Sequence, residues 1–395
     1  MPRFPTANIP IPGRVPVSIS IRIAVLILTL VPPILVGCDR STLPVGFVGP
    51  LTGSYSDLGV HGRNGAQLAA EEINAAGGVA GRRLELRVRD DFGTDEGAIR
   101  AGAELIRAGV RAIIGHMTSS QSVAAMPQME AAGMVLLSPT ASTPELSGIR
   151  DHFFRVQPST DASAGALAQY AVRDLGLTRM AVVMDMGNPA YAEPFHRHFA
   201  RTFAALGGSL DAPAILDSRD FPSWEAAALS LAEKDREGVL VILSARDLAA
   251  LAQALAARGL NARLFSSGWA MTEDLLQMGG RTVENIVFSG HTFQDLETPA
   301  LRAFRERYRA RFGHTPSFAA AYAYDAMRVL ARALEQTRGR RAGLPEALTG
   351  IRDFPGLHWP ISIDEYGDTR SPMFITAVRD GRFVALRRLA PPEFP

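Results

Sequence analysis

Short apolar segments alternate along the chain with longer segments of helical periodicity. The stretch PVGFVGPL (44–51) is typical of a buried strand and ends in a polar turn that contains glycine. In GRNGAQLAAEEINAAGG (62–78) apolar residues recur at helical spacing, and the Gly77-Gly78 pair ends the helix. RRLELRVRDD (82–91) alternates as a half-buried strand does. Strand, helix and strand joined by short links predict a parallel, doubly wound sheet.

The same alternation continues in two sets, which predict two similar lobes with a sheet in each. The first set adds helices at 95–109 and 120–133 and strands at 110–117 and 134–142. The second set follows Asp161 and alternates helices at 165–176, 194–208, 224–235 and 247–259 with strands at 179–186, 212–218, 238–244 and 262–268.

A basic segment and an apolar run precede these sets. Residues 1–22 contain three Arg and no acidic residue, and residues 23–36 are almost all aliphatic. This pattern is typical of an export signal. The run is too short, and too interrupted by Pro32 and Pro33, for a membrane-spanning helix of about 20 residues.

The end of this run, Leu35-Val36-Gly37-Cys38, is similar to the bacterial lipobox, in which the Cys is acylated and the peptide is cut before it. We therefore expect residues 1–37 to be a lipoprotein signal peptide and Cys38 to be a lipid anchor on the outer face of a membrane, in the periplasm or cell envelope. Asp39 resembles the inner-membrane retention signal of enterobacterial lipoproteins. Because Cys38 is the only cysteine, the fold has to be stable without disulfides.

Composition and motifs exclude several classes of function. The chain is 47% hydrophobic with a formal net charge of +1, so an ample core is expected and no global field favours nucleic acid. No G-x-G-x-x-G, Walker or G-x-S-x-G motif occurs at the expected places. His196 and His198 are two residues apart on one helix, a poor spacing for zinc. We interpret Asp90 and Asp91 as carboxylates that cap the next helix. No catalytic residue, cofactor or metal is predicted.

Two loops have the character of ligand loops. GHMTSSQS (115–122) and LLSPTAST (136–143) each follow a predicted buried strand, so both belong at the carboxyl edge of the sheet, where ligands bind. Ser119 and Ser120 open a helix, where hydroxyls and free backbone N–H groups suit a carboxylate. Thr140 and Ser142 would add donors from the facing loop. The alternative is that these residues act only as helix caps and turn residues.

Four longer stretches, residues 45–91, 113–146, 181–194 and 360–383, resemble periplasmic solute-binding proteins of the leucine/isoleucine/valine-binding type, which serve ABC importers. The resemblance implies a type I periplasmic binding protein fold, in which two Rossmann-like lobes joined by a three-crossing hinge close on a small ligand. The crossings would lie near Pro158–Asp161, Ser289–Thr292 and Phe354–His358. Lobe 1 would comprise residues 42–159 plus 291–355, and lobe 2 residues 160–290 plus 356–390.

The resemblance also implies ligand contacts. It assigns Ser119 and Ser142 to hydroxyl contacts, Thr140 to a backbone contact and Tyr191 to an aromatic lid from lobe 2. The remaining matches are Leu58, which replaces an aromatic residue of the first loop, Ser244, which stands where relatives often have Tyr, and Trp269. For Ser244, a cap on the following helix together with Asp247 is the alternative.

One departure concerns the charge of the ligand. Branched-chain amino-acid binders have a Glu near Gly268 that pairs with the ligand ammonium, whereas Gly268 and Trp269 stand here. A buried ammonium without a counter-charge is costly. The expected ligand is thus a carboxylate with an apolar or aromatic body. The alternative is a branched-chain amino acid whose ammonium uses Asp185, Asp295 or water.

The expected function is capture of a small carboxylate for an ABC importer, with permease subunits as partners, a membrane contact through the lipid anchor, no nucleic acid and a monomeric chain. The alternative is a sensor component that presents its ligand state to a separate receptor or kinase. No enzymatic activity is expected.

Overall fold

The computed structural model describes residues 42–220, 223–232, 236–260, 263–292 and 298–390, with isolated positions 2, 10 and 13. The expected signal peptide, Cys38 and Asp295 lie outside the described residues. Everything below concerns the unit from Ser41 to Pro395. In this described part, no helix has the length and apolar character needed to cross a membrane.

The first sheet is parallel and doubly wound. Its described strands lie in the order β2-β1-β3-β4-β5. Their bounds are β1 (Leu43–Gly49), β2 (Leu84–Asp90), β3 (Ile113–Ile114), β4 (Leu136–Ser138) and β5 (Phe153–Arg155). The order reverses between β1 and β3, so the loops after these two strands diverge and leave a crevice at the carboxyl edge. This edge is where the sequence places the ligand loops.

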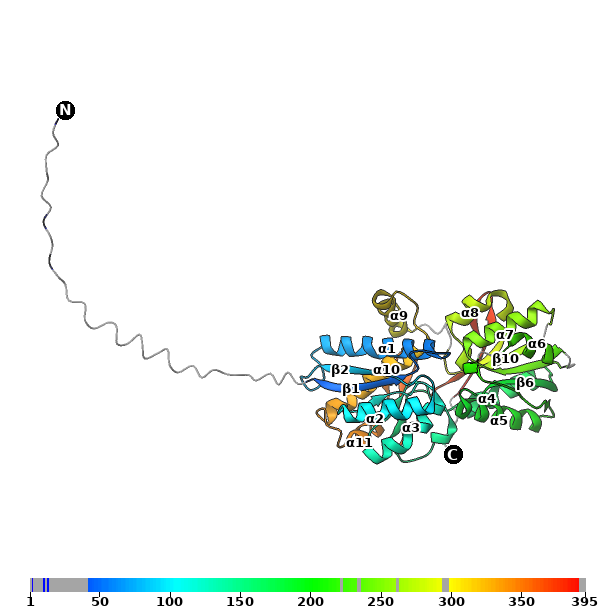
Figure 1. Ribbon diagram of the computed structural model, residues 1–395, viewed down its shortest axis with the longest axis horizontal. Coiled ribbons are helices and arrows are strands. Elements are labelled where there is room, and N and C mark those ends of the chain that lie inside the picture. The colour runs from blue at the N-terminus through cyan, green and yellow to red at the C-terminus, as the bar shows by residue number, and fades with distance from the viewer. Residues whose placement is uncertain are drawn as a thin grey trace. The chain divides into compact units, whose positions relative to one another are not determined.

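Helices cover both faces of this sheet (Figure 1). One face packs against α1 (Ser56–Ala75), α9 (Pro299–Phe312), α10 (Phe318–Gln336) and α11 (Leu344–Thr349). The other packs against α2 (Asp95–Arg107), α3 (Ser119–Ala132) and η1 (Pro144–Leu146). α1 and α10 lie very close, because a Cβ placed on Gly65 would come within 2.0 Å of the carbonyl oxygen of Ala320.

The second sheet repeats this plan and adds antiparallel strands at one edge. Its described strands lie in the order β15-β14-β11-β10-β9-β6-β7, and β8 also pairs with β6. The parallel strands are β6 (Arg179–Asp185), β7 (Ser209–Leu210), β8 (Ala214–Leu216), β9 (Gly238–Ile242), β10 (Arg263–Ser267) and β11 (Val287–Gly290). β14 (Met373–Arg379) and β15 (Arg382–Leu389) are the antiparallel strands.

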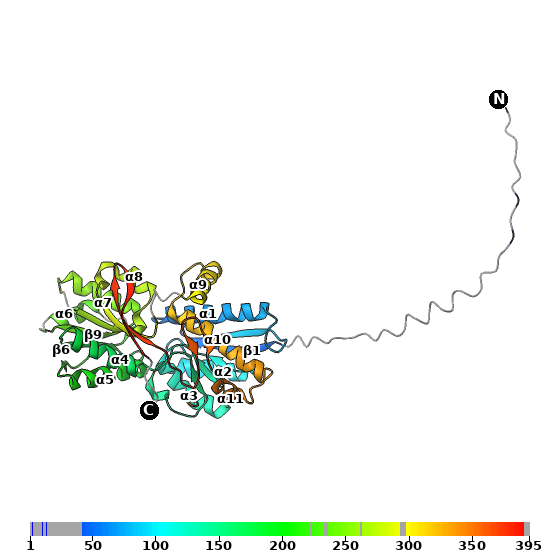
Figure 2. The ribbon, with the colours of Figure 1, turned by 180° about the vertical axis from the view of Figure 1, so that it is seen from behind.

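Helices again cover both faces (Figure 2). α4 (Asp161–Gln169), which continues into η2 (Tyr170–Asp174), and α5 (Pro189–Ala205) pack on one face. The other face carries α6 (Trp224–Ala232), α7 (Ala245–Ala257) and α8 (Glu273–Gly279). The short helical turns are η3 (Ser218–Asp220), η4 (Gly268–Ala270) and η5 (Gly280–Val283). The predicted α/β class with two Rossmann-like sheets is confirmed.

The chain passes between the two sheets three times: between β5 and α4, between β11 and α9, and on the way to β14. The last passage lies later than the predicted Phe354–His358. The hairpin of β12 (Phe354–Pro355) and β13 (Pro360–Ile361) contributes Leu357 and Ile361 to the core of the first sheet, together with Ile363. This apolar packing holds residues 356–363 with the first sheet.

Candidate ligand-binding site

A cavity with about 40 Å³ of free space lies at the carboxyl edges of both sheets. From the first sheet it is lined by the loops after β3 and β4 and by the side chains of Leu58, Phe318 and Tyr322. From the second sheet it is lined by residues that follow β6 and β10 and by the end of β11. This volume holds only a few water molecules, because each needs about 10–15 Å³. This space is smaller than a ring-sized ligand.

The cavity brings together six of the eight ligand residues predicted from the sequence. These are Leu58, Ser119, Thr140, Ser142, Tyr191 and Trp269. All except Trp269 are buried. They come from two sheets and from segments more than 200 positions apart in the sequence, so the structure brings them to one place as the predicted fold requires.

Ser120 and Ser244 have other roles. The backbone N–H and the hydroxyl of Ser120 both donate to Asn188 Oδ1, each at 3.1 Å. Ser120 therefore joins α3 to the start of α5 and does not line the cavity. Ser244 caps α7, because its Oγ accepts from the backbone N–H of Asp247 at 3.3 Å. It lies outside the cavity, in agreement with the capping alternative.

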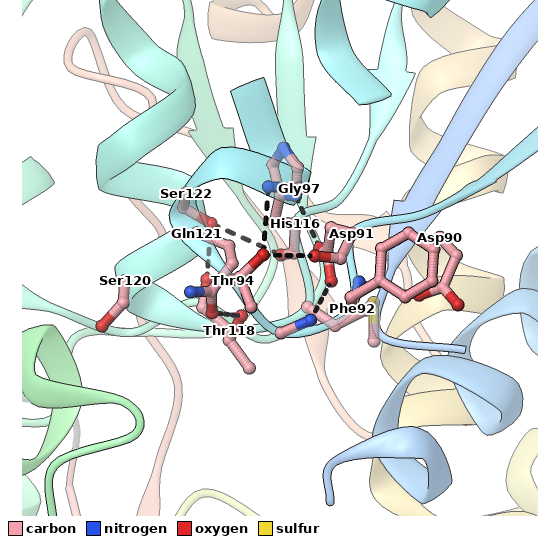
Figure 3. A network of polar contacts seen from close by, with 12 residues as sticks. Asp90, Asp91, Phe92, Thr94, Gly97, His116, Thr118, Ser120, Gln121 and Ser122 are labelled. Carbon is pink, nitrogen blue, oxygen red and sulfur yellow. Dashed lines mark hydrogen bonds and ion pairs between the residues drawn. The ribbon is translucent and has the colours of Figure 1, made fainter. Parts of the chain in front are cut away.

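A buried polar network supports the loop that carries Ser119 (Figure 3). His116 Nδ1 lies 2.7 Å from Asp91 Oδ2, and both side chains are fully buried. The other carboxylate oxygen of Asp91 accepts from the backbone N–H of Gly93 at 3.0 Å. The expectation that Asp90 and Asp91 cap the next helix is wrong, because Thr94 caps α2 by accepting from Gly97 N. Through its contact with His116, Asp91 instead holds the segment after β3, where the loop that carries Ser119 begins.

Further hydrogen bonds join the two predicted ligand loops to each other. Ser138 Oγ donates to the carbonyl of His116 at 2.7 Å, and the Thr140 hydroxyl donates to the carbonyl of Met117. The backbone N–H of Ser142 donates to Ser119 Oγ at 3.3 Å. The loops are therefore held in one arrangement without a ligand, which lowers the entropy that binding has to offset.

The wall opposite these loops is aromatic. The ring centroid of Trp269 lies 5.4 Å from that of Tyr191 and 5.6 Å from that of Tyr55. Burial raises the pKa of Tyr191, so the phenol is neutral at physiological pH. Flat apolar faces of this kind suit the body of an apolar or aromatic ligand.

Tyr55 also connects the two sheets directly. Its hydroxyl donates to Asp185 Oδ2 at 2.6 Å, and Asp185 is fully buried. Asp185 Oδ1 accepts from the backbone N–H groups of Gly187 and Ser218. Asp185 does not line the cavity, so its expected use as a partner for a ligand ammonium is not supported. Tyr55 was not among the predicted residues, although it is an aromatic residue of the first loop only three positions before Leu58.

Further polar residues line the cavity and were missed. Five of them have a buried polar atom without a hydrogen-bond partner in the described part of the chain: Gln157 Oε1, Thr160 Oγ1, Ser289 Oγ, His291 Nε2 and Tyr322 OH. The hydroxyl of Ser142, one of the predicted ligand residues, is also buried without a hydrogen-bond partner among the described residues. Most of these residues lie where the chain passes between the sheets, where no periodic pattern marks them.

Charge is scarce at the cavity. Among its described lining residues there is no Asp, Glu, Lys or Arg, and His291 is the one that can become cationic. Within the described residues, no cluster of three or more His, Cys, Asp or Glu could hold a metal ion. The arrangement can donate several hydrogen bonds and cover an apolar body, but it supplies no carboxylate to a cation.

A model of the family described as periplasmic binding protein matches residues 42–382. The chain belongs to this family. It is a family of binding proteins, not of enzymes. A Leu/Ile/Val-binding protein of Rhizobium johnstonii is 26% identical over 84% of this chain and 89% of its own length.

Solved structures agree with this membership. The structure of a leucine-binding protein from Thermotoga maritima aligns with a TM-score of 0.80 at 25% identity, over 88% of this chain and 99% of that one. An ABC-transporter solute-binding protein of Rhodopseudomonas palustris, solved with benzoate, aligns with a TM-score of 0.80 at 20% identity, over 89% and 97%. The latter likeness concerns the fold alone.

Proposed function

We propose that this periplasmic binding protein captures a small carboxylate without an ammonium group, between its two lobes, and delivers it to an ABC importer. The observation that carries the proposal is the cavity lining. It combines the hydroxyls of the Ser119 and Ser142 loops with aromatic faces, and its described residues include no Asp or Glu. An ammonium in such a cavity would lack a counter-charge, which is costly in a desolvated site.

The carboxylate would lie at the start of α3. This helix begins at Ser119, and its cap residue Thr118 donates its hydroxyl to Gln121 instead of accepting from the helix backbone. A helix N-terminus attracts anions through its N–H groups and its dipole. The Ser142 hydroxyl, buried and without a partner, would add a charge-assisted hydrogen bond.

The relatives include both ligand classes, amino acids and carboxylates without an ammonium, and therefore do not decide between them. The Rhizobium relative is named for leucine, isoleucine and valine, whereas the Rhodopseudomonas structure contains benzoate on the same fold. The choice therefore depends on the residues of this chain. Gly268 and Trp269, at the position of the acidic residue in the resemblance, favour the carboxylate without ammonium.

Calorimetric titration of matched ligands tests the proposal. Leucine is compared with 4-methyl-2-oxopentanoate, and phenylalanine with phenylpyruvate. We expect the oxo acid to bind at least tenfold more tightly, a difference of about 1.4 kcal/mol. Amino acids that bind tenfold more tightly than their oxo acids would show that an acidic partner exists at the site and would contradict the proposal.

Closure would link binding to transport. We define each lobe as one sheet with the helices that pack on it, and we assign residues 356–363 to lobe 1. Tyr55–Asp185 and Ser120–Asn188 would then be bonds of the closed state. A bound carboxylate should compact the protein in solution scattering and raise its melting temperature by mass action. If the protein is saturated with a carboxylate that binds and its radius of gyration does not decrease, the proposed closure is contradicted.

Export and anchoring complete the proposal. Acylation of Cys38 would hold the chain at a membrane, and a Cys38→Ala variant should lose palmitate labelling. Labelling that persists in this variant would exclude the anchor. The alternative function, presentation of the ligand state to a sensor, is distinguished by whether the purified protein stimulates uptake by a permease or binds a receptor.

A further inference from the structure

The unpartnered polar atoms of the cavity are concentrated on two connecting segments, residues 157–160 and 289–292. These segments contribute Gln157 Oε1, Thr160 Oγ1, Ser289 Oγ and His291 Nε2. Thr160, Ser289 and His291 are each more than nine-tenths buried, with 4%, 1% and 7% of their surface exposed. Native proteins leave few buried polar atoms without a partner, and each such atom calls for a physical explanation.

The contacts of His291 determine what its free nitrogen can accept. Nδ1 lies 3.2 Å from the carbonyl oxygen of Pro372, and a carbonyl can only accept a hydrogen bond. Ser371 Oγ also lies 3.2 Å from Nδ1, and it can accept there because its own hydroxyl donates to the Pro372 carbonyl at 3.3 Å. The neutral ring with the proton on Nδ1 satisfies these contacts and leaves the lone pair of Nε2 at the cavity. Burial lowers the pKa of His291, with a partial offset from neighbouring backbone carbonyls, so this neutral form prevails at physiological pH. The partner of Nε2 must be a donor.

The polar groups around His291 restrict which ligand group can occupy this region. The hydroxyls of Thr160 and Ser289 can donate or accept, and Gln157 Oε1 can only accept. With no Asp, Glu, Lys or Arg among the described lining residues, nothing there balances a formal charge. A group that donates to His291 and accepts from a serine or threonine, while uncharged, is a hydroxyl.

The connecting segments are close to the carboxylate loops. The backbone N–H of Thr160 donates to the carbonyl of Ser142 at 2.9 Å. A ligand whose carboxylate meets Ser142 therefore presents its adjacent carbon, and not its far end, to this region. This is the carbon that carries the ammonium in an amino acid.

We propose that Gln157, Thr160, Ser289 and His291 form a hydroxyl-binding subsite, which selects a 2-hydroxy carboxylate over the corresponding acid with no substituent at carbon 2. The inference rests on the proposed function, because it assumes a carboxylate at the Ser119 and Ser142 loops. His291 and Ser289 are its specificity-determining residues.

Two matched series of acids test the subsite by calorimetry. One consists of 4-methylpentanoate, 4-methyl-2-oxopentanoate and 2-hydroxy-4-methylpentanoate. The other consists of 3-phenylpropanoate, phenylpyruvate and 3-phenyllactate. In the series that binds better, we expect the hydroxy acid to bind about 10- to 100-fold more tightly than the unsubstituted acid, as for a hydrogen bond that a buried site is built to make. The oxo acid, which cannot donate to His291, should be weaker than the hydroxy acid.

Two variants separate selectivity from folding. His291→Phe should reduce the preference for the hydroxy acid over the unsubstituted acid to threefold or less. Ser289→Ala, a smaller change, should reduce the same preference in part if His291→Phe does not fold. An unsubstituted or oxo acid that binds wild type as tightly as the hydroxy acid would overturn the subsite and leave the proposed function intact. Failure of all six acids to bind would overturn both.

Discussion

The two sides of the cavity differ in how their polar groups are satisfied. On the first sheet, the loop of Ser119 is held by Asp91, His116 and Thr140 through hydrogen bonds that need no ligand. On the connecting segments, Thr160, Ser289 and His291 keep buried polar atoms without a partner in the described residues. Under the proposed function, the first side would hold the carboxylate through its preset loops and the unpartnered Ser142 hydroxyl, and the connecting segments would distinguish one carboxylate from another.

The largest expected effect comes from removing the support of the prepared side. Asp91→Ala leaves His116 and the backbone N–H of Gly93 buried without their partner, and each such group costs about 1–3 kcal/mol of stability. Denaturant unfolding measures the loss. Glu104→Ala is the matched control, because it breaks the exposed pair with Arg89 and should cost less than about 1 kcal/mol. Equal losses of stability in the two variants would show that the buried network contributes no more than an exposed ion pair.

A second prediction concerns the bond that joins the two sides. Tyr55→Phe removes the hydrogen bond to Asp185 without touching the cavity lining. Affinity for any bound carboxylate should fall by about 1.5–3 kcal/mol, the range for a hydrogen bond to a charged group, because the closed state is destabilised. Tyr366→Phe, at a tyrosine that does not line the cavity, should bind the same carboxylate with wild-type affinity. Wild-type affinity in Tyr55→Phe would show that the bond does not contribute to closure.

A pair of serine variants sharpens the assignment of the carboxylate. Ser119→Ala should weaken carboxylate binding by about 1–3 kcal/mol, with titration as the measurement. Ser244→Ala should leave affinity unchanged and lower the free energy of unfolding by about 0.5–2 kcal/mol, because this serine caps α7. Unchanged affinity in Ser119→Ala would remove Ser119 from the site.

The last prediction concerns Asp325, next to Tyr322 on α10. Burial raises the pKa of Asp325 to about 7, so the folded protein keeps a proton there between about pH 4 and 7, where the unfolded chain has lost it. Stability from this group is therefore present at low pH and lost as pH rises through 7. Asp325→Asn should gain stability relative to wild type as pH rises from 5 to 7, by at most about 1.4 kcal/mol per pH unit. A difference between the two that is independent of pH would contradict the raised pKa.

Local pattern was sufficient for the sheets and for the prepared side. Alternation and helical spacing identify β1, α1 and β2, and the rule that ligands bind at the carboxyl edge finds Ser119, Thr140 and Ser142. The family resemblance also selected Ser244, because the sequence alone does not separate a serine that caps a helix from one that meets a ligand. The structure separates the two through the hydrogen bond to Asp247.

The connecting segments could not be predicted in this way. Thr160 and His291 lie between elements and Ser289 lies near the end of β11, in stretches too short to show a periodicity. Only tertiary packing removes water from their side chains. The packing of the hairpin at 354–361 could not be predicted for a related reason, since Leu357 and Ile361 gain their partners from α10 and the first sheet, far away in sequence. Tyr55 was overlooked because its partner Asp185 is 130 positions away.

The proposed ligand class can be checked by native mass spectrometry of gently purified protein, with extraction and identification of the bound molecule. We expect one small molecule per chain that has a carboxylate and no ammonium, and that has a hydroxyl at carbon 2 if the connecting segments act as inferred. A co-purified amino acid, released only on unfolding, would contradict the claim that this cavity excludes an ammonium.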